Sequence, residues 1–177
     1  MRLVDEHFTR RARPRLASGD LTVRWMTRRD LHRALAIEAE CFEYPWSLEL
    51  FEHHLSRRDC VALVVELTEG SRRRLAERWT PWPIGYVLYS FDSDSLRVLN
   101  LAVAPEWQLR GVGRALVAAL KAKLTSRQRD RIECEVRETN VDAQLFCRRM
   151  GFRAVAVLHG RYDDCDEDSY LMHLPAR

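Results

Sequence analysis

The chain has 177 residues, 46% of them hydrophobic and 31% charged, and a formal net charge of +3. These values are typical of one globular domain, and the charge is too small to indicate nucleic-acid binding. The five cysteines include no C-x-x-C pair and the six histidines are dispersed, so neither a disulfide framework nor a metal site is predicted. No apolar run reaches the roughly 20 residues of a membrane span, and the N-terminus lacks the apolar core of a signal peptide. We therefore expect a cytoplasmic protein without a membrane partner.

Residues 1–20 are rich in arginine and end in a turn signal, Ala17-Ser18-Gly19-Asp20. We interpret them as a basic extension that precedes a single domain at residues 21–177. A solvated tail is favoured over an arm that contacts RNA or the ribosome.

Residues 21–25 have the pattern of a first strand, and Thr27 and Asp30 fit a capping box that opens a helix. Pro45 then interrupts the chain, and Ser47 is placed to cap a second helix. Helical spacing predicts one apolar side for this second helix, formed by Leu48, Phe51 and Leu55.

Residues 60–67 and 84–91 are mostly apolar, which predicts an antiparallel pair of strands. Their connection, residues 69–83, carries four arginines and two tryptophans and is long for a hairpin. We interpret it as a loop insertion. A surface flap whose tryptophans fold back on the sheet is favoured over a nucleic-acid contact.

The most informative segment is an apolar strand from Val98 that runs through a glycine-containing turn into an amphipathic helix. Gly111 and Gly113 lack a Cβ, so the backbone can approach a ligand closely there, and a helix N-terminus favours an anion. The side chains of Arg110 and Arg114 are able to pair phosphate oxygens. An ordinary strand-to-helix turn is the alternative. The predicted phosphate-binding turn comprises Gln108, Leu109, Arg110, Gly111, Val112, Gly113 and Arg114.

After this turn, apolar residues recur at every fourth position and predict the buried stripe of a helix, formed by Val112, Leu116, Leu120 and Leu124. Residues 131–137 alternate apolar and polar side chains, as in a half-buried strand whose polar face holds Glu133, Glu135 and Arg137. Asn140 is placed to cap a short helix that ends at Gly151, and residues 152–158 and 169–174 predict two last strands.

The pattern Gln-x-x-Gly-x-Gly from Gln108 to Gly113 resembles the acetyl-CoA pyrophosphate loop of the GCN5-related N-acetyltransferases, the GNAT family. The stretches 135–140 and 150–152 are similar to elements of its RimI-like subfamily, the ribosomal-protein-alanine N-acetyltransferases. Further likenesses to that subfamily are Glu38, Phe42, Pro45-Trp46-Ser47, Tyr162, Glu167-Asp168 and Met172. The resemblance spans residues 21–174. It implies an α/β (α+β) GNAT fold, in which helices flank a mixed, mostly antiparallel sheet of about seven strands.

The resemblance implies an enzyme that moves the acetyl group of acetyl-CoA to a primary amine by direct attack and releases coenzyme A. It also implies that Glu135 accepts the amine proton. A base is needed because a protein α-amino group, with a pKa of about 7.7 to 8.0, is mostly protonated at neutral pH. A glutamate, with an ordinary pKa of about 4.3, becomes an effective base when partial burial raises that pKa. Without the resemblance, Glu135 is interpreted as a solvent-facing strand residue paired with an arginine.

By the same resemblance, the backbone of Leu101, Ala102 and Val103 contacts the pantetheine and the thioester. Asn140 has two open interpretations, a helix cap and a pantetheine contact. Cys147 stands where the family usually has a tyrosine that protonates the departing thiolate. This thiol is either the general acid or a small packing residue, and Tyr162 and water are the alternative proton donors.

An acidic run occupies residues 163–168, in the predicted last hairpin. Its negative potential favours a basic acceptor, such as the N-terminus of a ribosomal protein, although a solvated turn explains the run equally well. The expected acceptor-binding residues are Trp46, Asp166, Glu167 and Asp168. Two rival functions are the acetylation of a small amine or amino acid, and a non-catalytic module that senses coenzyme A or binds the ribosome.

Overall fold

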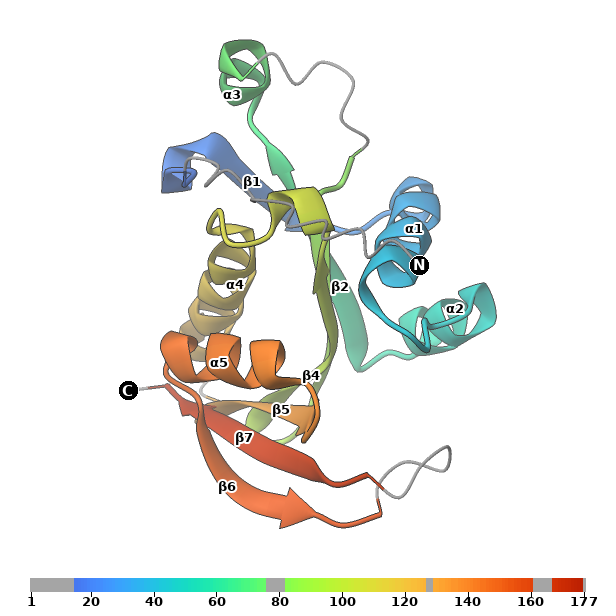
Figure 1. Ribbon diagram of the computed structural model, residues 1–177, viewed down its shortest axis with the longest axis vertical. Helices are drawn as coiled ribbons and strands as arrows, with labels where there is room; N and C mark the ends of the chain where they lie inside the picture. Colours follow the sequence, from blue (N-terminus) through green and yellow to red (C-terminus); the bar gives the residue numbers. More distant parts are fainter. Residues whose placement is uncertain (1–14, 76–81, 127–128, 161–166, 177) are drawn as a thin grey trace, which may run out of the picture.

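The computed structural model describes residues 15–75, 82–126, 129–160 and 167–176, which form a seven-stranded sheet with helices on both faces (Figure 1). The strand order is β1-β2-β3-β4-β5-β7-β6. Strands β4 and β5 run parallel, and every other neighbouring pair is antiparallel. This confirms the predicted mixed, mostly antiparallel sheet. The strands are β1 (Leu21–Trp25), β2 (Cys60–Leu67), β3 (Gly85–Phe91), β4 (Ser95–Val103), β5 (Arg131–Arg137), β6 (Arg153–Leu158) and β7 (Ser169–Pro175).

The longer helices cover both faces of the sheet because each has one apolar side. Figure 1 shows α1 and α2 on one face and α4 and α5 on the other. The predicted stripe of α4, from Val112 to Leu124, is buried, and β2 and β3 are buried along almost their whole length. The helices are α1 (Leu31–Cys41), α2 (Leu48–Ser56), α3 (Glu69–Arg74), α4 (Val112–Ser126) and α5 (Val141–Met150).

The predicted ends of α2 and α5 are confirmed by their capping contacts. Ser47 Oγ accepts a hydrogen bond from Leu50 N at 3.3 Å, and Asn140 Oδ1 accepts one from Ala143 N at 3.0 Å. Gly151 ends α5 with a φ of +98°, a left-handed conformation that side chains disfavour. On α2, however, the predicted apolar side is wrong at Leu48, which is 42% exposed, whereas Phe51 is fully buried.

The N-terminal segment that the structure describes packs on the domain, which corrects the predicted solvated tail for residues 15–20. Leu16 is buried, and its N–H donates to the carbonyl oxygen of Arg110 at 2.9 Å. Asp20 is also buried and accepts hydrogen bonds from Ser71 Oγ at 2.7 Å and from Ala17 N at 2.9 Å. The domain therefore includes residues 15–20, and residues 1–14 lie outside the described part of the chain.

The connection between β2 and β3 is partly helical, which corrects the predicted loop. Residues 69–74 form α3, and the Arg72 guanidinium lies 4.2 Å from the centroid of the Trp82 ring. Trp82 lies beside buried Trp107, with 6.3 Å between ring centroids, so this tryptophan does fold back toward the core. Trp79 lies outside the described residues.

Strand β5 is more buried than the alternating pattern predicts. Glu133, expected on a polar face, is 5% exposed and pairs with Arg131 at 2.7 Å and with Arg97 at 3.5 Å. The reason is tertiary, because β5 lies inside the sheet between β4 and β7, and Arg97 of β4 and His173 of β7 contact Glu133 from the neighbouring strands.

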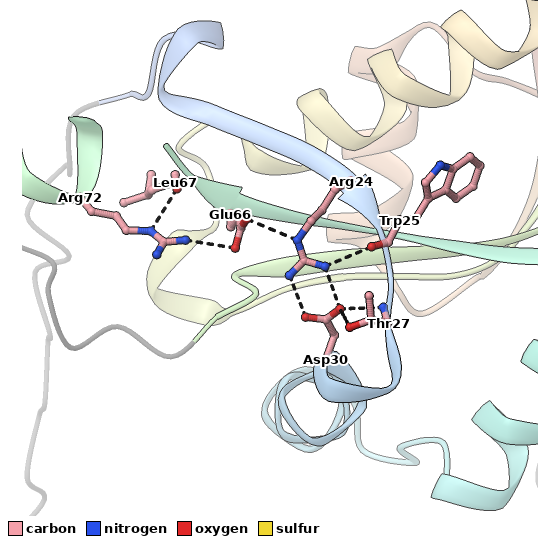
Figure 2. Close-up of polar contacts among 7 residues, drawn as sticks. All are labelled: Arg24, Trp25, Thr27, Asp30, Glu66, Leu67 and Arg72. Carbon is pink, nitrogen blue, oxygen red and sulfur yellow. Dashed lines mark hydrogen bonds and ion pairs between the residues drawn. The ribbon is translucent and has the colours of Figure 1, made fainter. Parts of the chain in front are cut away.

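A charged cluster joins β1, β2, α3 and the turn before α1 (Figure 2). Arg24 donates to both carboxylate oxygens of Asp30 at 2.8 Å and to Glu66 Oε1 at 3.3 Å. Glu66 also accepts from Arg72 at 3.1 Å. Asp30 in turn accepts from the backbone N–H and hydroxyl of Thr27, the predicted capping pair.

Candidate active site

The sheet opens between its two parallel strands. Strands β4 and β5 pair only over Ser95–Val98 and Arg131–Cys134. On the other edge of β4 the register with β3 shifts at Leu88 and Tyr89, so that Leu99 is an extra residue. Such a β-bulge bends its strand and increases its twist. The bulge therefore accounts for the point at which β4 turns away from β5.

This fork holds a cleft with a volume of about 510 Å³, a size that suits a small-molecule site. Glu38, Phe42, Tyr44 and Trp46 contribute from the α1 and α2 face of the sheet, and Val117, Phe146 and Cys147 contribute from the α4 and α5 face. The strands between them supply Arg97–Leu101 and Cys134–Arg137. The cleft is thus lined from both faces of the sheet.

Glu135 lies at the fork itself. It is the first residue of β5 beyond the last pair with β4, which joins Val98 and Cys134, and on its other side it pairs with Leu171 of β7. Its side chain is half-buried and lines the cleft. The structure thus places the predicted proton acceptor where strand pairing ends and a ligand can enter.

The predicted phosphate-binding turn connects the end of β4 to the start of α4. Leu109 and Gly111 adopt left-handed φ values of +59° and +101°. The first intrahelical bond runs from Ala115 N to the Gly111 carbonyl at 3.1 Å. By helix geometry, the N–H groups of residues 111–114 therefore have no acceptor within the helix, and they point toward its N-terminal end.

Three residues of the turn have structural roles that the sequence did not predict. Arg110 is buried, with its guanidinium 4.3 Å from the centroid of the Trp107 ring, so its role as a phosphate-pairing side chain stays a prediction. Gln108 Nε2 donates to the Val103 carbonyl at 3.0 Å and so ties the turn to β4. At Gly113 a Cβ would lie 3.0 Å from Phe146, so this glycine allows α4 and α5 to approach each other.

The expected β4 positions divide between the cleft and the core. Leu101 lines the cleft. Ala102 and Val103 are buried and pair with Tyr86 and Gly85 of β3. Among the described lining residues, Leu101 is the last one of β4.

Cys147 is buried in the cleft wall, with its Sγ 3.8 Å from that of Cys134. The hydrogen bond between the two thiols, and then burial, raise the pKa of Cys134. Asn140 also lines the cleft, but its side-chain oxygen is used in capping α5, as one of its two interpretations predicted.

The expected acidic acceptor site stays a prediction, and its two described residues have contacts within the domain. Glu167 accepts from Arg137 Nη1 at 2.9 Å and from the backbone N–H of Thr139 at 3.1 Å. Asp168 contacts His159 Nδ1 at 2.7 Å and accepts from Gly160 N at 3.3 Å. Both carboxylates hold the hairpin and the strand beside it. Tyr162 and Asp166 lie outside the described residues.

Sequence reasoning missed a polar network on the α1 and α2 side of the cleft. Glu38 accepts hydrogen bonds from Tyr86 Oη, Asn100 Nδ2 and Trp46 N. The signal available in the sequence was Asn100, an amide in the middle of an apolar strand, because a polar group buried there needs a partner. Trp46, which was expected near the acceptor, does line the cleft.

The fold is that of a known family. The model of the Acetyltransferase (GNAT) family matches residues 31–152, so the chain belongs to this family. It is an acetyl-CoA-dependent acyltransferase, because acetyl-CoA is the cosubstrate of the family. Among the described residues, no helix is both long and apolar enough to cross a bilayer.

Similar proteins include the [ribosomal protein bS18]-alanine N-acetyltransferase of Escherichia coli K12, 28% identical over 82% of this chain and 91% of that protein. An uncharacterized N-acetyltransferase of Methanocaldococcus jannaschii is 30% identical over 86% of this chain and 90% of its own. The crystal structure of the ribosomal-protein-S18-alanine N-acetyltransferase from Escherichia coli has a TM-score of 0.72 at 25% identity, with coverage of 88% and 94%. Arabidopsis thaliana NAA60 in complex with acetyl-CoA shares the fold, with a TM-score of 0.69 at 22% identity and coverage of 88% and 98%.

Proposed function

We propose that this acetyltransferase modifies the α-amino group of a protein N-terminus, with the N-terminal alanine of a ribosomal protein as the preferred acceptor. The observation that carries the proposal is the cleft at the β4 and β5 fork, which is lined from both faces of the sheet and has Glu135 in its wall, just past the last β4–β5 pair. The names of the bS18-alanine N-acetyltransferases among its relatives support this acceptor. A ribosomal acceptor would place the reaction in the cytoplasm.

The α4 and α5 side suits acetyl-CoA, which supplies the thioester. The N–H groups at the start of α4 and the left-handed Gly111 form a backbone cradle of the kind that binds phosphates. Arg114, exposed in the first turn of α4, adds a positive charge beside this cradle. The fork beyond it exposes the β4 backbone from Leu99 to Leu101, which is suited to hold a pantetheine arm.

The α1 and α2 side suits the amine. An α-ammonium group must lose a proton before it attacks, and Glu135 is the carboxylate at the fork that accepts it, directly or through water. Cys147 lines the same cleft and donates a proton to the departing thiolate. In this proposal the Cys147 thiol takes the role of the tyrosine that the family usually has at this position.

A peptide assay tests the proposal. The protein is incubated with acetyl-CoA and a basic peptide that begins with alanine, and with the same peptide already acetylated at its N-terminus as the matched control. We expect thiol release with the free peptide only, and fragmentation that places the acetyl group on the α-nitrogen.

Other outcomes identify the rivals. Acetylation of a small amine in preference to the peptide supports a small-molecule enzyme. Binding of acetyl-CoA without turnover on any amine supports the non-catalytic module.

A further inference from the structure

Glu38 is a buried acid that the proposed chemistry does not use. Its side chain is on α1, and the residue is 1% exposed. Three donors from three other segments converge on its carboxylate: Tyr86 Oη of β3, Asn100 Nδ2 of β4 at 2.8 Å, and the backbone N of Trp46, before α2, at 3.1 Å. One carboxylate thus connects the helix, two strands and the segment between the helices.

The network holds Glu38 as an acceptor. Asn100 Nδ2 and the Trp46 amide can only donate. Burial, and then the charge of Glu38, raise the pKa of Tyr86, so that phenol keeps its proton and donates as well. Among the described residues, Glu38 takes part in no ion pair within 4.0 Å. A buried charge held by hydrogen bonds alone is costly, and fully satisfied buried networks of this kind specify one geometry.

The network lies at the acceptor side of the cleft. Glu38, Asn100 and Trp46 all line the cavity. The Trp46 ring stacks on His54, with 4.8 Å between centroids, and meets Phe51 edge-on at 5.6 Å. Two sets of contacts thus hold Trp46 in place: its ring packs against Phe51 and His54 of α2, and its backbone N–H donates to Glu38.

We propose that Glu38 is a positioning residue for the amine acceptor, acting through the backbone of Trp46 to hold residues 42–46 as the acceptor wall of the cleft. The assignment rests on the proposed function, because only an N-terminal acceptor gives that wall a substrate to orient. In this role Glu38 acts through the Trp46 backbone and not directly on the acetyl group or the amine.

The kinetic test compares Glu38→Ala with Glu38→Gln. In the alanine variant the KM for the alanine-initiated peptide should rise by about 10-fold, the effect expected from one lost charge-assisted hydrogen bond, while the KM for acetyl-CoA stays unchanged. In the glutamine variant the amide oxygen still accepts from Trp46 and Asn100, and the amide nitrogen donates to Tyr86, so the KM should return toward the wild-type value. If the alanine variant does not fold, Glu38→Asp replaces it. The aspartate side chain is one methylene shorter, so its carboxylate lies farther from the Trp46 N–H, and the peptide KM should rise.

The matched control is Asp30→Ala. Asp30 is another buried acid with several hydrogen bonds, and it lies in the Arg24 cluster away from the cleft lining (Figure 2). This variant should lose stability without changing the peptide KM. An equal rise of the peptide KM in both alanine variants would mean that Glu38 contributes stability only and would overturn the proposal.

A double-variant cycle tests whether Glu38 acts by positioning the Trp46 ring. If it does, Glu38→Ala should add nothing to the peptide KM of Trp46→Ala, because the ring that the Glu38–Trp46 backbone hydrogen bond holds in place is then absent. Additive effects of the two substitutions contradict the proposed route.

Hydrogen exchange separates this proposal from the proposed function. The Trp46 amide should exchange faster in Glu38→Ala than in Asp30→Ala or the wild type, and Glu38→Gln should restore its protection. This measurement needs no acceptor. Unchanged exchange at Trp46 refutes the positioning role, whereas a lack of peptide turnover by the wild-type protein refutes the proposed function instead.

Discussion

At the scale of single residues, the position of Glu135 in the sheet explains its proposed role. The residue before it, Cys134, is still paired with Val98 of β4. At that position the neighbouring strand leaves no opening between β4 and β5. Glu135 is the first residue past that pairing, so its side chain is half-buried at the cleft. Its location by itself makes it accessible to a ligand and partly shielded from water.

Replacing this carboxylate tests the proton transfer. Glu135→Gln keeps the shape of the side chain but cannot accept the amine proton. We expect kcat to fall by roughly 10²-fold or more while the affinity for acetyl-CoA is retained. Thiol release and calorimetric titration measure the two quantities, and a rate equal to that of the wild type rules out Glu135 as the base.

The thiol at position 147 can be tested by restoring the family's tyrosine. If Cys147 donates the proton to the leaving thiolate, Cys147→Ala should lower kcat by roughly 10²-fold, and Cys147→Tyr should recover part of that loss. Stopped-assay rates at saturating substrates measure both. Full activity of the alanine variant would leave Cys147 as a packing residue.

Gly111 is constrained by its backbone as well as by the proposed ligand. At a φ of +101°, a β-branched side chain is strained, so Gly111→Val should shift the turn and its N–H groups. We expect the Kd for coenzyme A to rise by about 10-fold or more.

Gly160→Val is the control for Gly111→Val, since Gly160 also has a positive φ, +55°, and the space around it is open. It should lose stability without a change in that Kd. Equal coenzyme A affinities for wild type and Gly111→Val would mean that the phosphates bind elsewhere.

At the scale of elements, two local devices shape the cleft. The Leu99 bulge separates β4 from β5, and the Asn140 cap fixes the start of α5, whose Ala143, Phe146 and Cys147 form part of the wall. Both devices act on the same opening, from the strand side and from the helix side.

The cap of α5 gives an element-scale prediction. Asn140→Ala removes the acceptor for Ala143 N and should lower the free energy of unfolding by about 1 kcal/mol, whereas Asn140→Asp keeps an acceptor and should keep the stability. Urea unfolding measures this difference. If Asn140 also donates to pantetheine, Asn140→Asp loses affinity for acetyl-CoA while its stability is retained, and unchanged affinity limits Asn140 to the cap.

At the scale of the whole molecule, the proposed sites of the two substrates lie on opposite faces of the sheet. Figure 1 shows α4 and α5 on one face and α1 and α2 on the other. The backbone cradle lies at the start of α4, whereas Glu38 belongs to α1 and Trp46 precedes α2. The fork is the opening in the described sheet that joins them. This arrangement suits direct attack, because the amine and the thioester can enter the fork from opposite faces of the sheet and meet there.

The global stability should depend on pH through the Arg24 cluster. The hydrogen bond from Arg24 lowers the pKa of Asp30 from its ordinary 3.8 to about 2. Since the folded pKa lies below the unfolded one, ionised Asp30 stabilises the fold above pH 3.8, and this contribution is lost as the pH falls toward about 2.

The measurement is urea unfolding of wild type and Asp30→Asn across this pH range. The stability difference between them should shrink as the pH falls from 3.8 to about 2. A constant difference would show that the Asp30 charge does not contribute.

Much of the secondary structure was predictable because its signals are local. The bounds of β1, β2 and β5 match the predicted ranges, and the caps at Ser47, Asn140 and Gly151 lie where the sequence puts them. These features depend on residues within one or two turns of each other. The same applies to the glycine turn before α4, whose left-handed Gly111 follows from the residue type.

The site needed the tertiary structure because its contacts join distant parts of the chain. Glu38 and Asn100 are 62 positions apart, and nothing near either residue in the sequence identifies the other. The burial of Leu16, of Arg110 and of Glu133 likewise depends on which elements pack beside them. The sequence by itself determined the elements, the family and the candidate base. Only the tertiary structure decided that β4 and β5 separate to form the cleft. Strand pairing and burial depend on neighbours that are distant in the sequence.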